Sequence, residues 1–113
     1  MIFPVIKAID IATAIEWYEH FLRFTCIYRN KIQDPEFAVI EKGKLKIYIR
    51  KNETNSLDQD SLIIEVNDLE KAYSECDAAG VIFTSGIEKS NFGGQQFSLK
   101  DYDHNNVIFI NGT

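Results

Sequence analysis

The sequence predicts an α+β fold of two βαβββ repeats that form a curved mixed sheet around a cavity. Segments 3–14 and 61–72, at an offset of 58 residues, each run from an alternating apolar strand into an Asp and a helix. The apolar helix positions keep this offset at i, i+3, i+4 and i+7, the stripe of an amphipathic helix. They are Ile11, Ala14, Ile15 and Tyr18 in one half and Leu69, Ala72, Tyr73 and Cys76 in the other. Such a half-unit cannot bury both faces of its sheet alone, so we expect the halves to pair.

The first half, residues 1–50, contains all elements of one repeat. Alternating residues predict a strand over 2–9, and Asp10 is a favourable N-cap for a helix that extends to about Leu22. Thr13 and Glu16 offer an alternative capping box. The rest of this half is predicted as strand 24–29, loop 30–35, strands 37–40 and 45–50, and the intervening hairpin turn 42–44.

A polar linker, residues 51–60, leads to the second repeat, residues 61–113, and we expect the whole chain to form one domain. Strand 62–66 precedes Asp68, which caps a helix ending near Ala79, and Gly80 takes the position after it. The remaining elements are predicted as strand 81–84, loop 90–94, strand 95–99, turn 101–105 and strand 107–110.

Composition narrows the range of partners and compartments. The 113 residues carry a net charge of −5, which disfavours nucleic acid because phosphates would be repelled. The two cysteines, Cys26 and Cys76, do not make a disulfide framework, and Cys76 on the apolar stripe predicts a buried free thiol. No apolar run approaches the ~18 residues of a membrane helix, and the amino-terminal apolar run is too short for a signal peptide. We therefore expect a cytoplasmic protein without membrane or nucleic-acid partners.

Several segments resemble the vicinal oxygen chelate superfamily, whose members include glyoxalase I, extradiol dioxygenases and bleomycin-resistance proteins. Asp10 followed by segment 17–24 is similar to its "D…A…FY…LGF" pattern, and segments 64–68 and 78–81 to "EVDD…AAGV". Segment 91–105 resembles the "WG…F…DPDGN" pattern of the bleomycin-resistance branch. The resemblance covers nearly the whole chain in the expected order and implies the paired βαβββ fold. It also implies a homodimer, often with exchanged strands and two cavities at the interface.

Four positions depart from these patterns. Arg23 stands where the family usually has Gly, and Phe92 where it has Trp. Tyr102, Asp103 and His104 replace Pro-Asp-Gly, so we expect His104 in a turn position that often needs a positive φ. The changes conserve the predicted shape of the chain.

Enzymes of this superfamily hold a divalent metal with His and Glu side chains. The resemblance places the family's two His positions on Phe3 and Ser61, and its final Glu on Ile108. Strand 45–50 contains no Glu, and Phe, Ser and Ile cannot replace imidazole and carboxylate ligands. We therefore expect no metal, no other cofactor and no metal-dependent catalysis.

Strand parity selects candidate ligand-binding side chains, because neighbouring residues of a strand point to opposite faces. Residues 4, 6 and 8 are predicted to face the helix and residues 3, 5 and 7 the cavity. The predicted ligand-binding residues are Phe3, Lys46, Tyr48, Arg50, Ser61, Glu65, Phe92, Gln96, Ser98 and Ile108.

Each candidate also has a structural interpretation. Glu65 is a candidate base or cation ligand, but it is also a candidate ion-pair partner of Lys7, its equivalent in the first repeat. Phe3, Tyr48 and Phe92 are aromatic side chains that can stack a planar ligand, or pack in a core or dimer interface.

The two histidines offer no obvious catalytic chemistry. His20 has no second metal ligand one helical turn away, and His104 lies in a turn, so we expect surface or structural roles for both. Turn 101–105 begins like a calcium loop but lacks its later Gly and Glu.

These observations favour a metal-independent protein that sequesters a small, planar or cationic organic molecule, similar to antibiotic-resistance proteins of the bleomycin type. A glyoxalase-like lyase or isomerase, or a dioxygenase with displaced metal ligands, is the alternative. A small structural domain whose cavity is filled by its own side chains is the third possibility.

Overall fold

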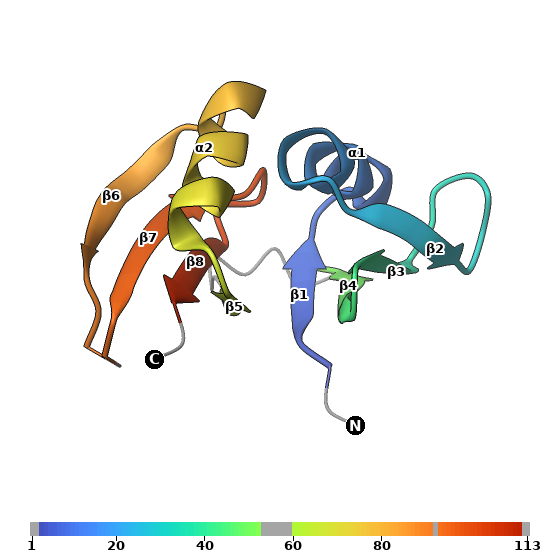
Figure 1. Cartoon of the computed structure of the whole chain (residues 1–113). Coiled ribbons are helices and arrows are strands. Elements are labelled where there is room, and N and C mark those ends of the chain that lie inside the picture. The colour runs from blue at the N-terminus through green and yellow to red at the C-terminus, as the bar shows by residue number, and fades with distance from the viewer. Residues whose placement is uncertain (1–2, 53–59, 92, 112–113) are drawn as a thin grey trace.

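The computed structural model describes residues 3–52, 60–91 and 93–111, and it contains two βαβββ units (Figure 1). This confirms the predicted fold class. The first unit comprises β1 (Val5–Ala8), α1 (Ile11–Leu22), β2 (Thr25–Arg29), β3 (Phe37–Lys42) and β4 (Leu45–Lys51). The second comprises β5 (Ser61–Val66), α2 (Leu69–Ala79), β6 (Phe83–Lys89), β7 (Gln95–Lys100) and β8 (Asn106–Asn111).

Each unit forms its own four-stranded mixed sheet. The strand orders are β1-β4-β3-β2 and β5-β8-β7-β6, so the two sheets repeat one topology. The first strand of each unit pairs in parallel with the last, and the other pairs are antiparallel. In Figure 1, α1 and α2 lie side by side between the sheets, and β2 and β6 form the outermost edges.

The two helices begin at equivalent Asp residues. The side chains of Asp10 and Asp68 accept hydrogen bonds from the backbone N–H of Thr13 and Lys71, which satisfies an amide that a helix start leaves unpaired. Asp10 is therefore the first N-cap, and the alternative box at Thr13 is not used. Helix α2 ends at Gly80 as predicted, with φ of 90°.

Helix α1 ends at Arg23, which has φ of 63°. This left-handed conformation is the one that glycine adopts without a steric penalty, so Arg23 keeps the turn at a cost. His104 likewise has φ of 65°, as its turn position predicts.

The core lies between each sheet and its helix. Alternate strand residues such as Ile6, Ile47 and Phe97 are almost completely buried against the apolar stripes of the helices. Residues of both units belong to one continuous cluster, so the halves share a core, as their separate sheets require.

The turn between β7 and β8 joins the two halves through polar contacts. Its side chains Asp101, Asp103 and Asn105, here called the turn clasp, each contact the first unit. Asp101 accepts a 2.6 Å hydrogen bond from the Tyr18 hydroxyl, and Asp103 accepts one of 3.0 Å from the backbone N–H of Ile9. Asn105 donates from Nδ2 to the backbone oxygen of Lys7 at 3.0 Å.

Burial makes the turn clasp important for stability. Asp101 and Asn105 are almost fully buried, and in the described residues no buried side-chain N or O atom lacks a hydrogen-bond partner. A buried polar network stabilises a fold only when all its members are satisfied, so the clasp fixes how the halves meet.

The largest difference from the predicted elements is β6. Strand 81–84 was expected, whereas β6 spans Phe83–Lys89 and contains Gly86. This edge strand pairs only with β7, with irregular register, and most of its side chains are exposed. A strand that is held by backbone pairing but not buried shows no apolar alternation in its sequence. The predicted strand therefore ended at residue 84, before the observed end of β6. Most of the predicted linker 51–60 lies outside the described residues.

Candidate functional site

The face of each sheet that points away from its helix is the candidate site, because both faces expose apolar side chains. Val5 is 47% exposed, Tyr28 52% and Ile63 49%, and the strand neighbours of Val5 and Ile63 on the helix side are buried. Large exposed apolar groups on one face indicate a surface for a ligand or a partner. We call these surfaces the N-terminal and C-terminal open faces.

An aromatic row crosses the N-terminal open face from β1 to β2. We use this name for Phe3, Tyr48, Phe37 and Tyr28. Phe3 stacks on Tyr48 with ring centroids 5.2 Å apart and an interplanar angle of 13°. Phe37 meets Tyr48 edge-on at 5.4 Å and Tyr28 at 6.1 Å. The four rings form a continuous apolar surface of the kind that stacks planar molecules.

Only part of this row was predicted from the sequence. Phe3 and Tyr48 were expected, and parity along β3 would also have selected Phe37, because its neighbour Ala38 is buried on the helix side. Tyr28 could not be found in this way. A β-bulge between Cys26 and Tyr28 shifts the register, so residues two apart face opposite sides.

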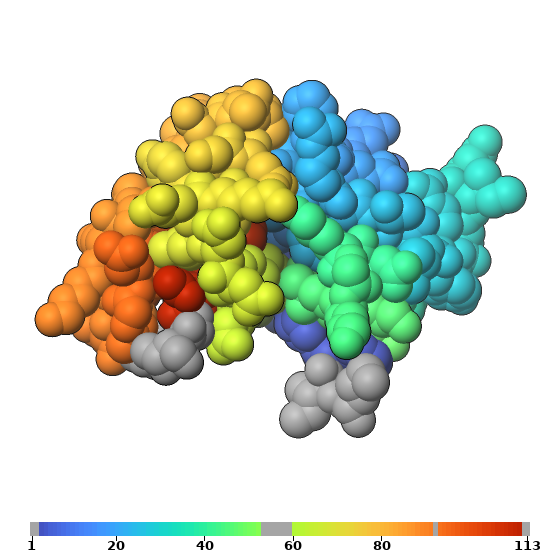
Figure 2. All heavy atoms as spheres, viewed as in Figure 1, coloured from blue at the N-terminus to red at the C-terminus, as the bar shows by residue number. Residues whose placement is uncertain are grey.

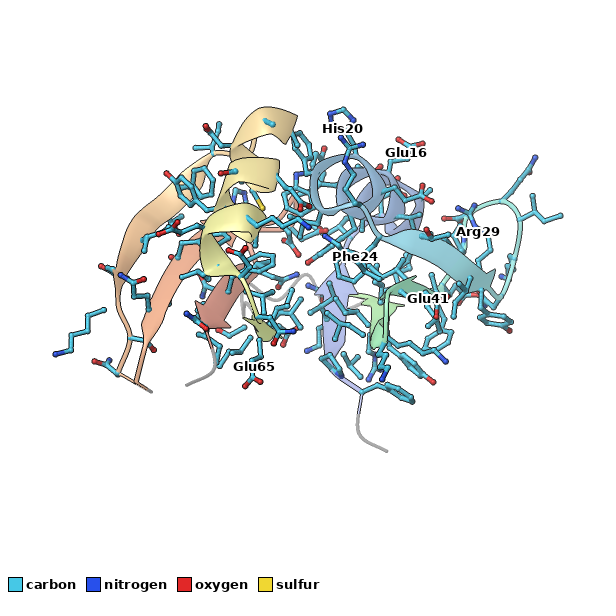
Figure 3. The ribbon with its side chains drawn as sticks, viewed as in Figure 1. Glu16, His20, Phe24, Arg29, Glu41 and Glu65 are labelled. Atoms are coloured by element: carbon cyan, nitrogen blue, oxygen red, sulfur yellow. The ribbon has the colours of Figure 1, made fainter. Side chains whose placement is uncertain are left out.

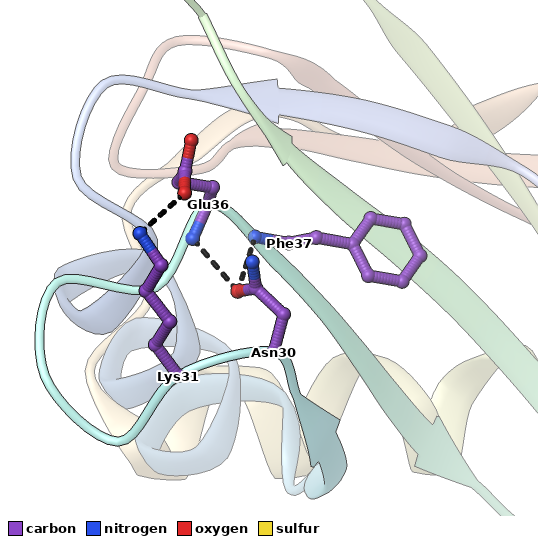
Figure 4. A network of polar contacts seen from close by, with 4 residues as sticks. All are labelled: Asn30, Lys31, Glu36 and Phe37. Atoms are coloured by element: carbon purple, nitrogen blue, oxygen red, sulfur yellow. Dashed lines mark hydrogen bonds and ion pairs between the residues drawn. The ribbon is translucent and has the colours of Figure 1, made fainter.

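The loop before β3 fixes the start of the aromatic row (Figure 4). The side-chain oxygen of Asn30 accepts hydrogen bonds from the backbone N–H groups of Glu36, at 2.9 Å, and Phe37, at 3.2 Å. Lys31 forms an ion pair with Glu36 at 2.6 Å. The two bonds from Asn30 close the loop and hold the backbone at Phe37, whose ring joins the row.

Cationic side chains surround the aromatic row. Lys46 and Arg50 lie on the same side of β4 as Tyr48, and Lys7 is the β1 partner of Arg50. Glu41 is the β3 partner of Lys46 and adds one acidic group. The N-terminal open face therefore presents three cations beside partly exposed rings.

The C-terminal open face is more aliphatic. Ile63, Ile108 and Ile110 occupy neighbouring strand positions on it. The predicted residues that border them are Ser61 and Glu65 on β5, and Gln96 and Ser98 on β7. Ser98 forms a 3.0 Å hydrogen bond with Thr84. Phe92, also predicted to bind ligand, lies outside the described residues.

The predicted residues thus form two groups on two different sheets, not one cluster. Phe3, Lys46, Tyr48 and Arg50 belong to the first, and Ser61, Glu65, Gln96, Ser98 and Ile108 to the second. The suggested pair of Glu65 with Lys7 is wrong for the single chain: within residues 3–52, 60–91 and 93–111 no ion pair joins them. Figure 3 shows Glu65 pointing away from both helices.

The residues present do not fit the catalytic metal of the superfamily. The positions that the resemblance assigns to metal ligands carry the ring of Phe3, the hydroxyl of Ser61 and the alkyl chain of Ile108. This set has one weak oxygen donor and no imidazole or carboxylate. In the described parts of the chain, no three His, Cys, Asp or Glu side chains gather closely enough to hold a metal.

The histidines and cysteines lie away from the open faces or are shielded. His20 is exposed near the end of α1 and points outward in Figure 3. Cys76 is a buried free thiol, as predicted, and burial raises its pKa to about 11. Cys26 is half-buried and also free.

A family comparison decides which superfamily this fold represents. The model of the glyoxalase/bleomycin resistance protein/dioxygenase superfamily matches residues 5–109. The chain belongs to this superfamily. The match spans both βαβββ units, which confirms the relationship predicted from the sequence motifs.

Several solved structures share the fold of the chain. A bleomycin-binding protein in complex with bleomycin has a TM-score of 0.86 at 20% identity, over 100% of this chain and 98% of that one. A bleomycin-binding protein from Streptomyces verticillus, complexed with copper(II)-bleomycin, gives 0.83 at 24% identity, covering 99% and 95%. Lactoylglutathione lyase from Agrobacterium tumefaciens gives 0.78 at 12% identity, covering 99% and 92%. Binding proteins and an enzyme thus share this fold, so the fold alone does not decide the function.

A search of curated proteins finds no match to the chain. Neither helix in the described residues is long and apolar enough to cross a membrane.

Proposed function

We propose that this protein binds and sequesters a small planar organic molecule on its open faces, without a metal and without a covalent step. The aromatic row carries this proposal. Three ring contacts join Phe3, Tyr48, Phe37 and Tyr28 across an exposed sheet face. A rigid apolar surface of this kind can stack a flat ligand while it loses little side-chain entropy.

The charges beside the row indicate which polar groups the ligand carries. Lys7, Lys46 and Arg50 favour an acidic group, and the fork of Arg50 can bind a carboxylate through two hydrogen bonds. Glu65 on the other face suits an amine. The proposal is therefore a planar ligand whose acidic end lies on the N-terminal open face and whose cationic end, if it has one, lies near Glu65.

A homodimer would complete the site. Val5, Tyr28 and Ile63 are about half exposed in the single chain, which supports association of the open faces of two copies. In this arrangement the N-terminal face of one copy lies opposite the C-terminal face of the other, and two clefts result. The resemblance to bleomycin-resistance proteins supports the same assembly and a role in antibiotic resistance.

The binding test is a calorimetric and thermal-shift screen of planar acids, planar cations and bleomycin-type glycopeptides. We expect planar compounds to raise the Tm and Tyr48→Ala to weaken the binding of the best compound at least about tenfold, because it removes the central ring. Tyr102→Ala is the matched control, since Tyr102 is 60% exposed in the β7–β8 turn and outside the row. Equal binding by the two variants, or no stabilisation by any planar compound, would contradict the proposal.

The assembly test is independent of the ligand. Ile63→Glu places a charge in the centre of the C-terminal open face and should convert a dimer into monomers in analytical ultracentrifugation. Ile82→Glu is the control, because Ile82 is 87% exposed in the connection between α2 and β6. A wild-type protein that stays monomeric at all concentrations would remove the dimer from the proposal.

A further inference from the structure

The seam between the two halves is filled on one side and hollow on the other. Here the seam means the contact of α1 and α2 and the turns beside them. The repeat places Trp17 and Tyr18 of α1 in correspondence with Glu75 and Cys76 of α2. A large aromatic pair in one half thus corresponds to an acidic side chain and a small thiol in the other. The side chains therefore fill more volume on the Tyr18 side of the seam than on the Cys76 side.

The side of Tyr18 is closed by aromatic packing and by the turn clasp. Tyr18 is 1% exposed, and its ring packs edge-on against Trp17 at 5.0 Å and Phe24 at 5.8 Å. Its hydroxyl reaches Asp101 in the turn between β7 and β8. That turn has five residues between its strands, which lets it extend to the other half.

The side of Cys76 has a small thiol in place of the Tyr18 ring, and its turn is shorter than the one that carries the turn clasp. The turn between β3 and β4 has two residues, Gly43 and Lys44, between its strands. A cavity of about 320 Å³ remains there, between the end of α1, the β3–β4 hairpin, β5 and α2. In Figure 2 the yellow surface of β5 and α2 meets the green hairpin at this seam. The apolar side chains that line the cavity include Phe21, Phe24, Leu45, Ile64, Cys76 and Phe109.

The rim of the cavity carries both signs of charge. Three cationic and three acidic residues line it, so the rim has no net charge: Arg23, Lys42, Lys71, Glu65, Asp68 and Glu75. Lys42 donates a 3.0 Å hydrogen bond to the backbone oxygen of Leu22, which ties the hairpin to the end of α1. An apolar interior with a balanced rim selects a ligand by its shape and ring surface, not by its charge.

We propose that this seam cavity binds a small uncharged aromatic molecule of one or two rings. The ring would replace, on the side of Cys76, the side chain that Tyr18 supplies on the other side. A dry apolar cavity of about 150 Å³ already holds benzene, and ligand sites begin near 300 Å³, so this cavity can take a molecule the size of indole. Phe24 and Phe109 line the cavity and offer aromatic contacts to such a ring. The site is distinct from the aromatic row and shares only Glu65 with the open faces.

Indole is the probe for the test, and ¹H–¹⁵N NMR of the full chain is the first readout. We expect saturable shifts that centre on the backbone amides of Cys76, Leu45 and Phe109, together with an indole-dependent rise in Tm. Shifts that centre on Val5 and Tyr48 would place indole on the N-terminal open face and overturn the proposal. The absence of saturable shifts would also overturn it.

Filling the cavity provides the second readout. Cys76→Tyr restores the residue of the other half, and it should fold with unchanged or higher stability and bind indole at least about tenfold more weakly. Ala78→Tyr adds the same side chain at an exposed position of α2 and should bind indole like the wild type. If Cys76→Tyr does not fold, Ala72→Leu fills the cavity from the preceding helical turn. Undiminished indole binding by the filled, folded variant would contradict the assignment.

Discussion

Removal of one hydroxyl from the seam tests how strongly the turn clasp joins the two halves. Tyr18→Phe keeps the buried ring but deletes the 2.6 Å hydrogen bond to Asp101. The carboxylate keeps three bonds, from the backbone N–H of Asp103 and Asn105 and from Asn105 Nδ2. A hydrogen bond to a charged group contributes about 1.5 to 3 kcal/mol, and the buried acceptor cannot recover it from water. We expect the free energy of unfolding to fall by about this amount, and the Tm by at least about 6 °C for a domain of this size.

The assay is urea unfolding at neutral pH, followed by circular dichroism and by the fluorescence of the single tryptophan, Trp17. At this pH the Tyr18 hydroxyl remains a donor, because burial, reinforced by Asp101, raises its pKa well above the usual value. Tyr102→Phe removes an exposed hydroxyl from the same turn and should change stability by less than about 0.5 kcal/mol. A Tyr18→Phe variant as stable as this control would refute the view that the clasp fixes the halves together.

Three other predictions follow from strained or buried groups. Arg23→Gly should raise the free energy of unfolding by about 1 kcal/mol, since Gly adopts φ of 63° without the steric penalty; a lower urea midpoint would argue against strain there. Because the pKa of Cys76 is raised to about 11 from 9.0, folding holds the thiol neutral, so stability is complete below pH 9 and falls as pH rises towards 11. At pH 10 the free energy of unfolding should be lower by about 1 kcal/mol because of this thiol. Cys76→Ala should therefore flatten the pH dependence of the urea midpoint between pH 9 and 11, and an unchanged slope would contradict this prediction. A thiol reagent at pH 8 should label half-buried Cys26 well before Cys76, whereas equal labelling rates in the folded protein would show that Cys76 is accessible.

Most of the fold could be predicted from local patterns in the sequence. Alternation along β1, β4, β5 and β8 identified which side chains face the helices, because one buried face imposes a period of two on a strand. The helix starts could also be predicted, since Asp10 and Asp68 are caps that bond within the first turn of each helix.

Features that depend on distant contacts were not visible in the same way. The hydrogen bond from Tyr18 to Asp101 joins residues 83 positions apart, and no local sequence pattern predicts it. The bulge before Tyr28 broke the parity argument within one strand. The seam cavity exists because the small side chain of Cys76 leaves space that a larger residue would fill. This space becomes apparent only when the two halves are compared in three dimensions.

A titration before and after chelation tests whether the protein binds a planar ligand without a metal. The best compound from the screen is titrated by calorimetry into protein as purified and into protein dialysed against a chelator, with elemental analysis of both. We expect one affinity for both samples and no stoichiometric metal, because Phe3, Ser61 and Ile108 provide no ligand set. Stoichiometric nickel, zinc, iron or manganese, with binding or turnover that disappears on chelation, would rule out metal-independent binding and favour a lyase, isomerase or dioxygenase.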